Sequence, residues 1–286
     1  MEEQNLPEAP QTLEGYYMLH DVYRVDWLKW RSADESRRDA IIDMAKRWLR
    51  GDDEERRGDS AAYSVLTQKG DIMFVHYRAT PDELNQAELE FRQMPLSAFL
   101  KPTYSYFSVI EIGLYELTAI ARGKLAREGI KPGDAGYEQA FEKEMAGQHE
   151  RVKTRLFRMI PDERYICFYP MNKRRGEQVN WYTLTLDERR NMMRGHGRIG
   201  HKYHVIVTQI IGGWTALDDW ECGVSLHAND MLTFKKLVYE MRFDPASALF
   251  AEFGPFYLGI RCPVDEFGNL MMGRAPSKAG TEDYSV

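Results

Sequence analysis

The segment 194–198 places a histidine between two glycines, in the order Arg-Gly-His-Gly-Arg. His196 is a candidate metal ligand, because a neutral imidazole is the commonest metal-binding side chain. On a helix, Met192 and Met193 would lie four and three residues before it on the same apolar face. The flanking glycines would let a bulky group approach the backbone closely. The alternative is a core histidine whose nitrogens are satisfied by hydrogen bonds.

A helix start lies eleven residues before this histidine. Thr185 and Glu188 have the spacing of a capping box, in which each side chain binds the other residue's backbone N–H. We therefore expect a helix over 186–196 that ends at His196.

A second set of candidate residues lies on the segment 165–171, which has the pattern of a strand. Side chains alternate along a strand, so Tyr169, Met171 and Lys173 would share one face. Pro170 between them favours the end or edge of a sheet, where side chains can meet a cavity. The phenol of tyrosine has a pKa of about 10, so at neutral pH Tyr169 would be a hydrogen donor rather than a base. The alternative is a strand end with an ordinary tyrosine.

Gln209 is a polar residue in an otherwise apolar row. A strand over 204–211 would put it on one face with Val205, Val207 and Ile211. A buried amide without a partner costs about 1–3 kcal/mol. Gln209 should therefore have either a hydrogen-bond partner in the core or a role in a site.

The elements that must position these residues occur twice in the same order. Each half shows strand, helix, two strands, helix and strand, which predicts an α+β fold made of two duplicated ferredoxin-like β-α-β-β-α-β units. Each sheet would be covered by its own helices on one face, so the two sheets would form a central antiparallel barrel-like structure. We expect a first unit over 12–115, a charged inter-repeat segment over 116–150, a second unit over 151–266 and a flexible tail over 267–286.

Composition excludes several classes of protein. The chain is 29% charged and 43% hydrophobic, as is usual for a soluble domain, and its net charge of −6 disfavours binding to nucleic acid. No apolar run reaches the roughly 20 residues that span a bilayer. The three cysteines, at 167, 222 and 262, match neither a disulfide framework nor a zinc site. The acidic, polar start is unlike a secretory signal, so we expect a cytoplasmic location.

The motifs of the second half closely resemble the chlorite-dismutase-like haem proteins, and within them the coproheme decarboxylases of bacterial haem synthesis. The first half resembles them more loosely, over 15–17, 63–72 and 104–111. The segments that carry the closer resemblance are 164–175, 180–182, 207–213, 218–224, 236–244 and 251–254, together with His196.

The resemblance implies a role for each candidate residue. His196 would be the axial ligand of the haem iron, and Tyr169 the catalytic residue that forms a radical. Lys173 would contact a propionate and manage its proton, while Met171 and Gln209 would shape the distal face of the porphyrin. Trp181 would lie near the haem, although packing is the simpler interpretation for so large a side chain. Three further residues would hold propionates, namely Arg155, Arg242 and Ser247.

The resemblance also implies a reaction. Hydrogen peroxide would drive the oxidative decarboxylation of two propionates of iron coproporphyrin III (coproheme), which is both substrate and redox cofactor, and the product would be haem b. Such proteins assemble as homopentamers, and contact with coproporphyrin ferrochelatase is expected.

Two other functions stay open. One is a chlorite dismutase or haem peroxidase on the same scaffold, which Gln209 disfavours because chlorite dismutases carry arginine at that position. The other is a haem carrier without catalysis, for which a row containing Tyr169, Met171 and Lys173 has no evident use.

Overall fold

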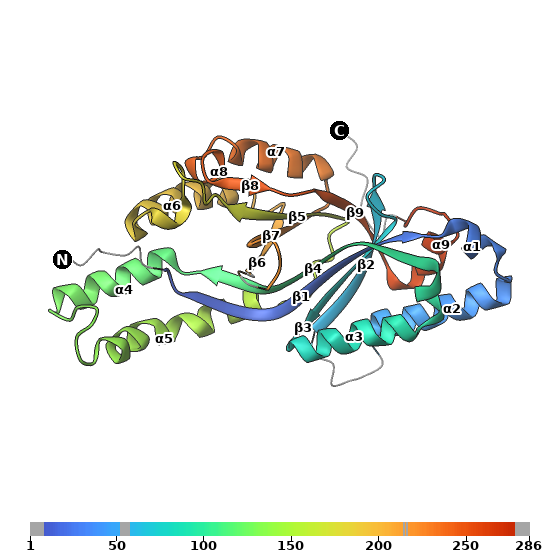
Figure 1. Cartoon of the computed structure of the whole chain (residues 1–286), viewed down its shortest axis with the longest axis horizontal. Helices are drawn as coiled ribbons and strands as arrows, with labels where there is room; N and C mark the ends of the chain where they lie inside the picture. Colours follow the sequence, from blue (N-terminus) through green and yellow to red (C-terminus); the bar gives the residue numbers. More distant parts are fainter. Residues whose placement is uncertain (1–8, 52–57, 214, 216, 278–286) are drawn as a thin grey trace.

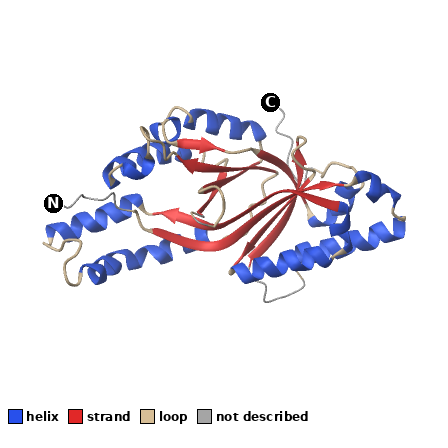
Figure 2. Cartoon of the chain, in the orientation of Figure 1, coloured by secondary structure: helices blue, strands red, loops and turns tan. Residues whose placement is uncertain are grey.

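A closed β-barrel forms the centre of the protein. The computed structural model describes residues 9–51, 58–213, 215 and 217–277, and within them nine strands form one antiparallel sheet in the order β7-β6-β4-β1-β3-β2-β9-β5-β8. Strand β5 pairs with β7 as well as with β9, so eight of these strands close into a ring. The predicted α+β fold with a barrel-like sheet is therefore confirmed (Figure 1, Figure 2).

The first half contains one ferredoxin-like unit, whose strands lie in the order β4-β1-β3-β2. Its second long helix begins at a capping box between Thr80 and Glu83, with Pro81 at the first helical position. The elements of this half are β1 (Thr12–Val25), α1 (Trp27–Ser32), α2 (Glu35–Arg50), β2 (Gly58–Leu66), β3 (Ile72–Arg78), α3 (Pro81–Gln93), η1 (Pro95–Phe99) and β4 (Leu100–Gly113).

The second half repeats the same strand order as β9-β5-β7-β6. The two units join edge to edge, since β4 pairs with β6 and β2 pairs with β9. The elements are β5 (Tyr165–Lys173), η2 (Trp181–Thr183), α6 (Leu186–Lys202), β6 (Thr208–Gly213), β7 (Cys222–Ala228), α7 (Met231–Met241), α8 (Pro245–Ala248), β8 (Ala251–Phe253) and β9 (Tyr257–Cys262).

The helices cover the outer faces of the barrel. Figure 1 shows α2 and α3 beside the strands of the first unit, and α6, α7 and α8 over the strands of the second. Each helical layer buries its own apolar cluster against the sheet, around Phe74 in the first unit and around Leu226 in the second. The interior of the barrel is a third cluster, which contains Ile166 and Phe168 of β5.

The inter-repeat segment is mainly helical. It contains α4 (Tyr115–Arg127) and α5 (Tyr137–Leu156), which pack against each other and extend beyond the barrel (Figure 1). Their contact is apolar, because Leu125 and Phe141 are buried in the same cluster. Helix α4 also contacts α6, where the guanidinium of Arg194 binds both carboxylate oxygens of Glu116 at 3.0 and 2.8 Å.

Three predicted boundaries were wrong. Helix α6 does not end at His196 but continues to Lys202, and β6 begins at Thr208 rather than at 204, since Val205 is 81% exposed in a turn. The tail was predicted to be flexible from 267, but α9 (Phe267–Met271) packs its first and last side chains into the core of the first unit. The last part of that predicted tail, 278–286, lies outside the described residues.

In the part of the chain that the structure describes, every helix is too short or too polar to cross a membrane.

Candidate active site

His196 lies in the second half of α6, on the face that packs against the rest of the second unit. The helix begins at the predicted capping box, where the Thr185 hydroxyl accepts from the N–H of Glu188 and the Glu188 carboxylate accepts from the N–H of Thr185. One turn before the histidine, Met192 and Met193 pack against a buried cluster around Trp181. These contacts fix the rotation of α6 and therefore the direction of the imidazole.

The imidazole of His196 is bound by a buried carboxylate. Its Nδ1 lies 2.9 Å from Oδ2 of Asp244, whose side chain is 4% exposed while that of His196 is 25% exposed. A carboxylate that accepts from Nδ1–H fixes the tautomer and the ring orientation, and it leaves Nε2 as the basic nitrogen. Among the described residues His196 has no second hydrogen-bond partner, so Nε2 is available to a ligand.

Asp244 was missed by sequence reasoning. Its Oδ1 accepts from the N–H of Ala246 at 2.9 Å, which caps the short helix α8 with Pro245 at the first helical position. An aspartate before a proline is a local signal for such a cap. The same signal carries no information about a histidine 48 residues earlier in the chain.

Tyr169 is almost fully buried beside two aromatic rings. Its ring stacks on Phe256 with centroids 4.5 Å apart and lies 5.7 Å from the ring of Phe253, and 4% of the residue is exposed. Met171, two residues later, packs on the same cluster under α6 and α7. Burial raises the pKa of the Tyr169 phenol well above its ordinary value of 10, so the hydroxyl keeps its hydrogen at neutral pH.

Lys173 is the last residue of β5 and lies close to Asp244, the carboxylate that binds His196. Its Nζ lies 4.4 Å from the ring centroid of Trp181, which is a cation–π distance. Burial lowers the pKa of Lys173, while Cys222 and the carboxylate of Asp244 act in the opposite direction. A partly desolvated ammonium is a stronger partner for a substrate carboxylate than a lysine on the surface.

Gln209 faces the helix that carries the histidine. A Cβ added at Gly200, one turn after His196, would lie 3.7 Å from Oε1 of Gln209 and 3.4 Å from Cε of Met241. The amide of Gln209 is therefore directed toward α6. The predicted apolar row is only partly formed, because Val207 is buried while Val205 and Ile211 are exposed.

The structure does not bring all three predicted propionate partners, Arg155, Arg242 and Ser247, to one place. The guanidinium carbon of Arg242 lies 3.6 Å from the ring centroid of Phe253, and the charge of Arg242 also acts on the pKa of Tyr169. Ser247 is buried on α8, three residues after Asp244. Arg155 is exposed on the last turn of α5, and within the described residues it makes no contact with this cluster.

These side chains fit an iron porphyrin that carries carboxylates. The imidazole of His196 is oriented by Asp244 and has one nitrogen free, which suits an axial iron ligand. A Cβ at Gly195 or Gly197 would meet nothing within 4 Å, so the backbone beside the histidine is open to a planar group. In a chain whose net charge is −6, Lys173 lies over Trp181 and Arg242 lies over Phe253, so two cations accompany the candidate site residues.

Comparison with known proteins identifies the family of this chain and agrees with its fold. Residues 38–262 match the chlorite dismutase family, and the chain belongs to this family. Over 268 residues the chain is 41% identical to the coproheme decarboxylase of Staphylococcus saprophyticus, and the match covers 93% of this chain and 99% of that protein.

Two groups of solved structures are similar to this chain. A haem-binding protein of Thermus thermophilus superposes with a TM-score of 0.80 at 36% identity, over 94% of this chain and 100% of that one. A mutant chlorite dismutase of Candidatus Nitrospira defluvii superposes with a TM-score of 0.68 at 18% identity, over 90% of this chain and 95% of that one. The second likeness is evidence for the fold alone.

Proposed function

We propose that this protein is a coproheme decarboxylase of haem biosynthesis. It converts two propionates of iron coproporphyrin III to vinyl groups, with loss of two CO2, and the product is haem b. The observation that carries the proposal is Tyr169, a buried phenol that shares one cluster with the cation of Arg242 and with α6, the helix of His196. The 41% identity to a coproheme decarboxylase over almost the whole chain supports the same reaction.

Hydrogen peroxide is the proposed oxidant. For each propionate, one peroxide and one CH2–CH2–COOH group give one vinyl group, one CO2 and two waters, which balances atoms and electrons. The bound iron porphyrin supplies the redox chemistry. The protein supplies an axial ligand in His196, a hydrogen donor in Tyr169 and cations that orient the carboxylates.

The two residues that act on the substrate's side chain are Tyr169 and Lys173. Oxidised Tyr169 takes a hydrogen atom from the β-carbon of a propionate, and the phenol is thereby restored. Transfer of the second electron through the bound porphyrin to the same peroxide, with loss of CO2 and of the carboxyl proton, would then leave the vinyl group. Lys173, with its lowered pKa, holds the departing carboxylate and exchanges a proton with it.

Other groups set the position of the ring. Arg242 and Ser247 would hold propionates, and Met171 and Gln209 would pack against the porphyrin ring. Arg155 serves as a propionate ligand only if the end of α5 moves toward the cluster, because its side chain is exposed in the structure. We propose further that the protein is a cytoplasmic homopentamer and that it receives coproheme from coproporphyrin ferrochelatase. Analytical ultracentrifugation tests the assembly.

The first experiment is a stepwise titration. The purified protein is mixed anaerobically with iron coproporphyrin III, peroxide is added in portions, and the porphyrin is followed by mass spectrometry. Successive loss of two carboxyl groups, ending at haem b, supports the proposal. Tyr169→Phe should bind the porphyrin and release no CO2, whereas the control Tyr17→Phe, on a half-buried tyrosine of β1 that stacks on Phe107, should react like the wild type.

The alternatives give different results in the same assay. A haem carrier would bind the porphyrin and leave its mass unchanged after peroxide. A chlorite dismutase would release oxygen rapidly from chlorite, and Gln209 in place of arginine argues against that activity.

A further inference from the structure

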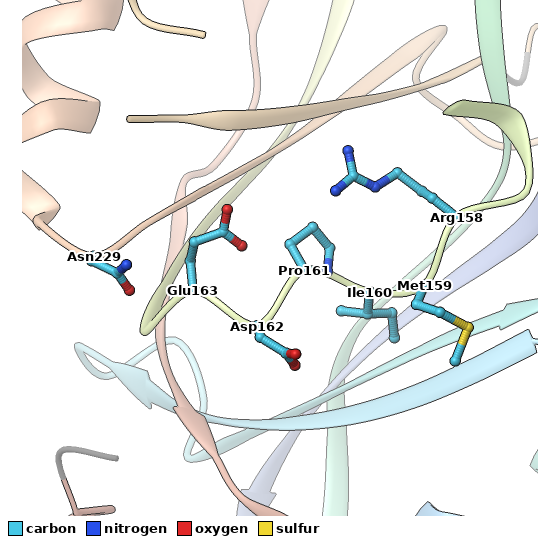
Figure 3. A pocket seen from close by; sticks show the side chains of 7 residues that line it. All are labelled: Arg158, Met159, Ile160, Pro161, Asp162, Glu163 and Asn229. Carbon is cyan, nitrogen blue, oxygen red and sulfur yellow. The ribbon is translucent and has the colours of Figure 1, made fainter. Parts of the chain in front are cut away.

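A second polar pocket lies at the end of β5 opposite to Lys173. The segment 158–163, which leads from α5 into β5, lines it together with Asn229, which follows β7. The cavity has a volume of about 540 Å³ (Figure 3). It shares no lining residue with the cluster around His196 and Tyr169.

The rim of this pocket is held by polar contacts. The N–H of Ile160 donates to Asp59 at 3.0 Å, and the Thr208 hydroxyl donates to Glu163 at 2.6 Å. Arg261 donates to the carbonyl of Pro161 at 2.8 Å and pairs with Asp162 at 3.1 Å. A rim fixed in this way does not have to be ordered when a ligand binds.

None of these rim contacts involves the cation of Arg158. Its side chain is half-buried, and among the described residues it has neither an ion pair nor a hydrogen bond. Figure 3 shows its guanidinium and the carboxylate of Glu163 extending to the same side of the segment, toward the cavity. The other arginine of this region, Arg261, is already paired with Asp162.

Two fully buried polar groups lie in the barrel interior near this rim, although neither lines the cavity. Both nitrogens of His227 and the hydroxyl of Tyr77 have no hydrogen-bond partner among the described residues. The register of neighbouring strands places them next to the residues that bind the rim, because His227 pairs with Thr208 and Tyr77 pairs with Asp59. Buried polar groups without a partner are rare in proteins, so an occupant is expected.

The charge of Arg158 acts on both of these groups. Burial lowers the pKa of His227 well below 6.5, with smaller contributions from the charges of Arg261, His20 and Arg158. Burial raises the pKa of Tyr77, and Arg158 opposes that increase. At neutral pH the imidazole and the phenol are therefore uncharged, and each has one hydrogen to donate.

We propose that this pocket binds a small molecule through a carboxylate group. The planar guanidinium of Arg158 holds the two carboxylate oxygens, and water bridges the ligand to the N–H of His227 and the O–H of Tyr77. The carboxylates of Asp162 and Glu163 at the rim repel an anion. The ligand's carboxylate therefore lies toward Arg158 and the buried floor, and the rest of the molecule extends outward.

The test is a calorimetric titration of the full-length protein with acetate, succinate and inorganic phosphate. Saturable binding of a carboxylate is expected, with phosphate weaker because it lacks the planar pair of oxygens. Arg158→Gln should weaken binding at least tenfold, and Arg158→Lys should weaken it less. Tyr77→Phe keeps the buried ring and removes only the hydroxyl, so it should weaken binding several-fold.

Controls separate this site from the proposed enzyme activity. Arg37→Gln, on an exposed arginine of α2, should leave carboxylate binding unchanged. Arg158→Gln should bind coproheme as the wild type does, measured by its visible absorption band. Absence of saturable carboxylate binding, equal affinity in Arg158→Gln, or a crystal grown in acetate with only water at Arg158 would each overturn the proposal, whatever the outcome for decarboxylation.

Discussion

Nδ1 of His196 lies 2.9 Å from Oδ2 of Asp244, and this contact joins the middle of α6 to the first turn of α8. The same carboxylate caps α8 through its other oxygen. One buried group therefore positions the candidate iron ligand and holds the segment that carries Ser247. An anionic partner at Nδ1 fixes the orientation of the ring and strengthens the bond of Nε2 to a metal.

The first prediction concerns this carboxylate. Asp244→Asn can still cap α8 but removes the negative charge beside the imidazole, so we expect coproheme affinity to fall about 10–100-fold. The iron–histidine stretching frequency in resonance Raman spectra should fall as well. Asp230→Asn is the matched control, since Asp230 caps α7 through Leu232 and does not touch His196. An unchanged frequency in Asp244→Asn would show that the carboxylate does not tune the ligand.

The second prediction concerns the buried charge of Lys173. Because burial lowers its pKa, the folded state binds fewer protons than the unfolded state between that lowered pKa and the ordinary 10.5. The free energy of unfolding therefore rises with pH in this window. Lys173→Met should make the ligand-free protein more stable at pH 7, and its advantage over the wild type should shrink as pH rises toward 10.5. Urea unfolding from pH 7 to 10 measures this, with exposed Lys236→Met as control.

The sequence predicted features that depend on neighbouring residues and failed where distant contacts decide. The start of α6 was correct because a capping box is complete within four residues. The end of α6 was wrong because Gly197 resembles a stop signal, yet the helix continues and its later turns pack on α7. The contact between His196 and Asp244 joins residues 48 apart, and the exposure of Arg155 depends on how α5 packs; no local pattern predicts either.

The third prediction uses the two glycines beside His196. Both lie inside α6, and a methyl group at either would meet nothing within 4 Å, so glycine-to-alanine changes should stabilise the ligand-free protein by about 0.5–1 kcal/mol each. Gly195 is half-buried and Gly197 is exposed. If the porphyrin lies against the half-buried side, Gly195→Ala should weaken coproheme binding several-fold and Gly197→Ala should not. Thermal unfolding and spectroscopic titration give both quantities, and equal affinities would argue against this approach of the ring.

The last prediction concerns acid stability, which the barrel interior controls. Burial lowers the pKa of His20 to about 3 and that of His227 well below 6.5, so each destabilises the fold by up to about 1.4 kcal/mol per pH unit as pH falls below 6.5. Burial raises the pKa of Asp21 to about 6, which acts in the opposite direction between pH 6 and 4. Two of these three groups act against the third, so the three together contribute a net loss of about 1.4 kcal/mol per pH unit in that range. His20→Gln should abolish most of this slope in urea unfolding, whereas His201→Gln, on an exposed histidine, should retain it. A slope that His20→Gln leaves unchanged would mean that this imidazole is not held neutral by the barrel.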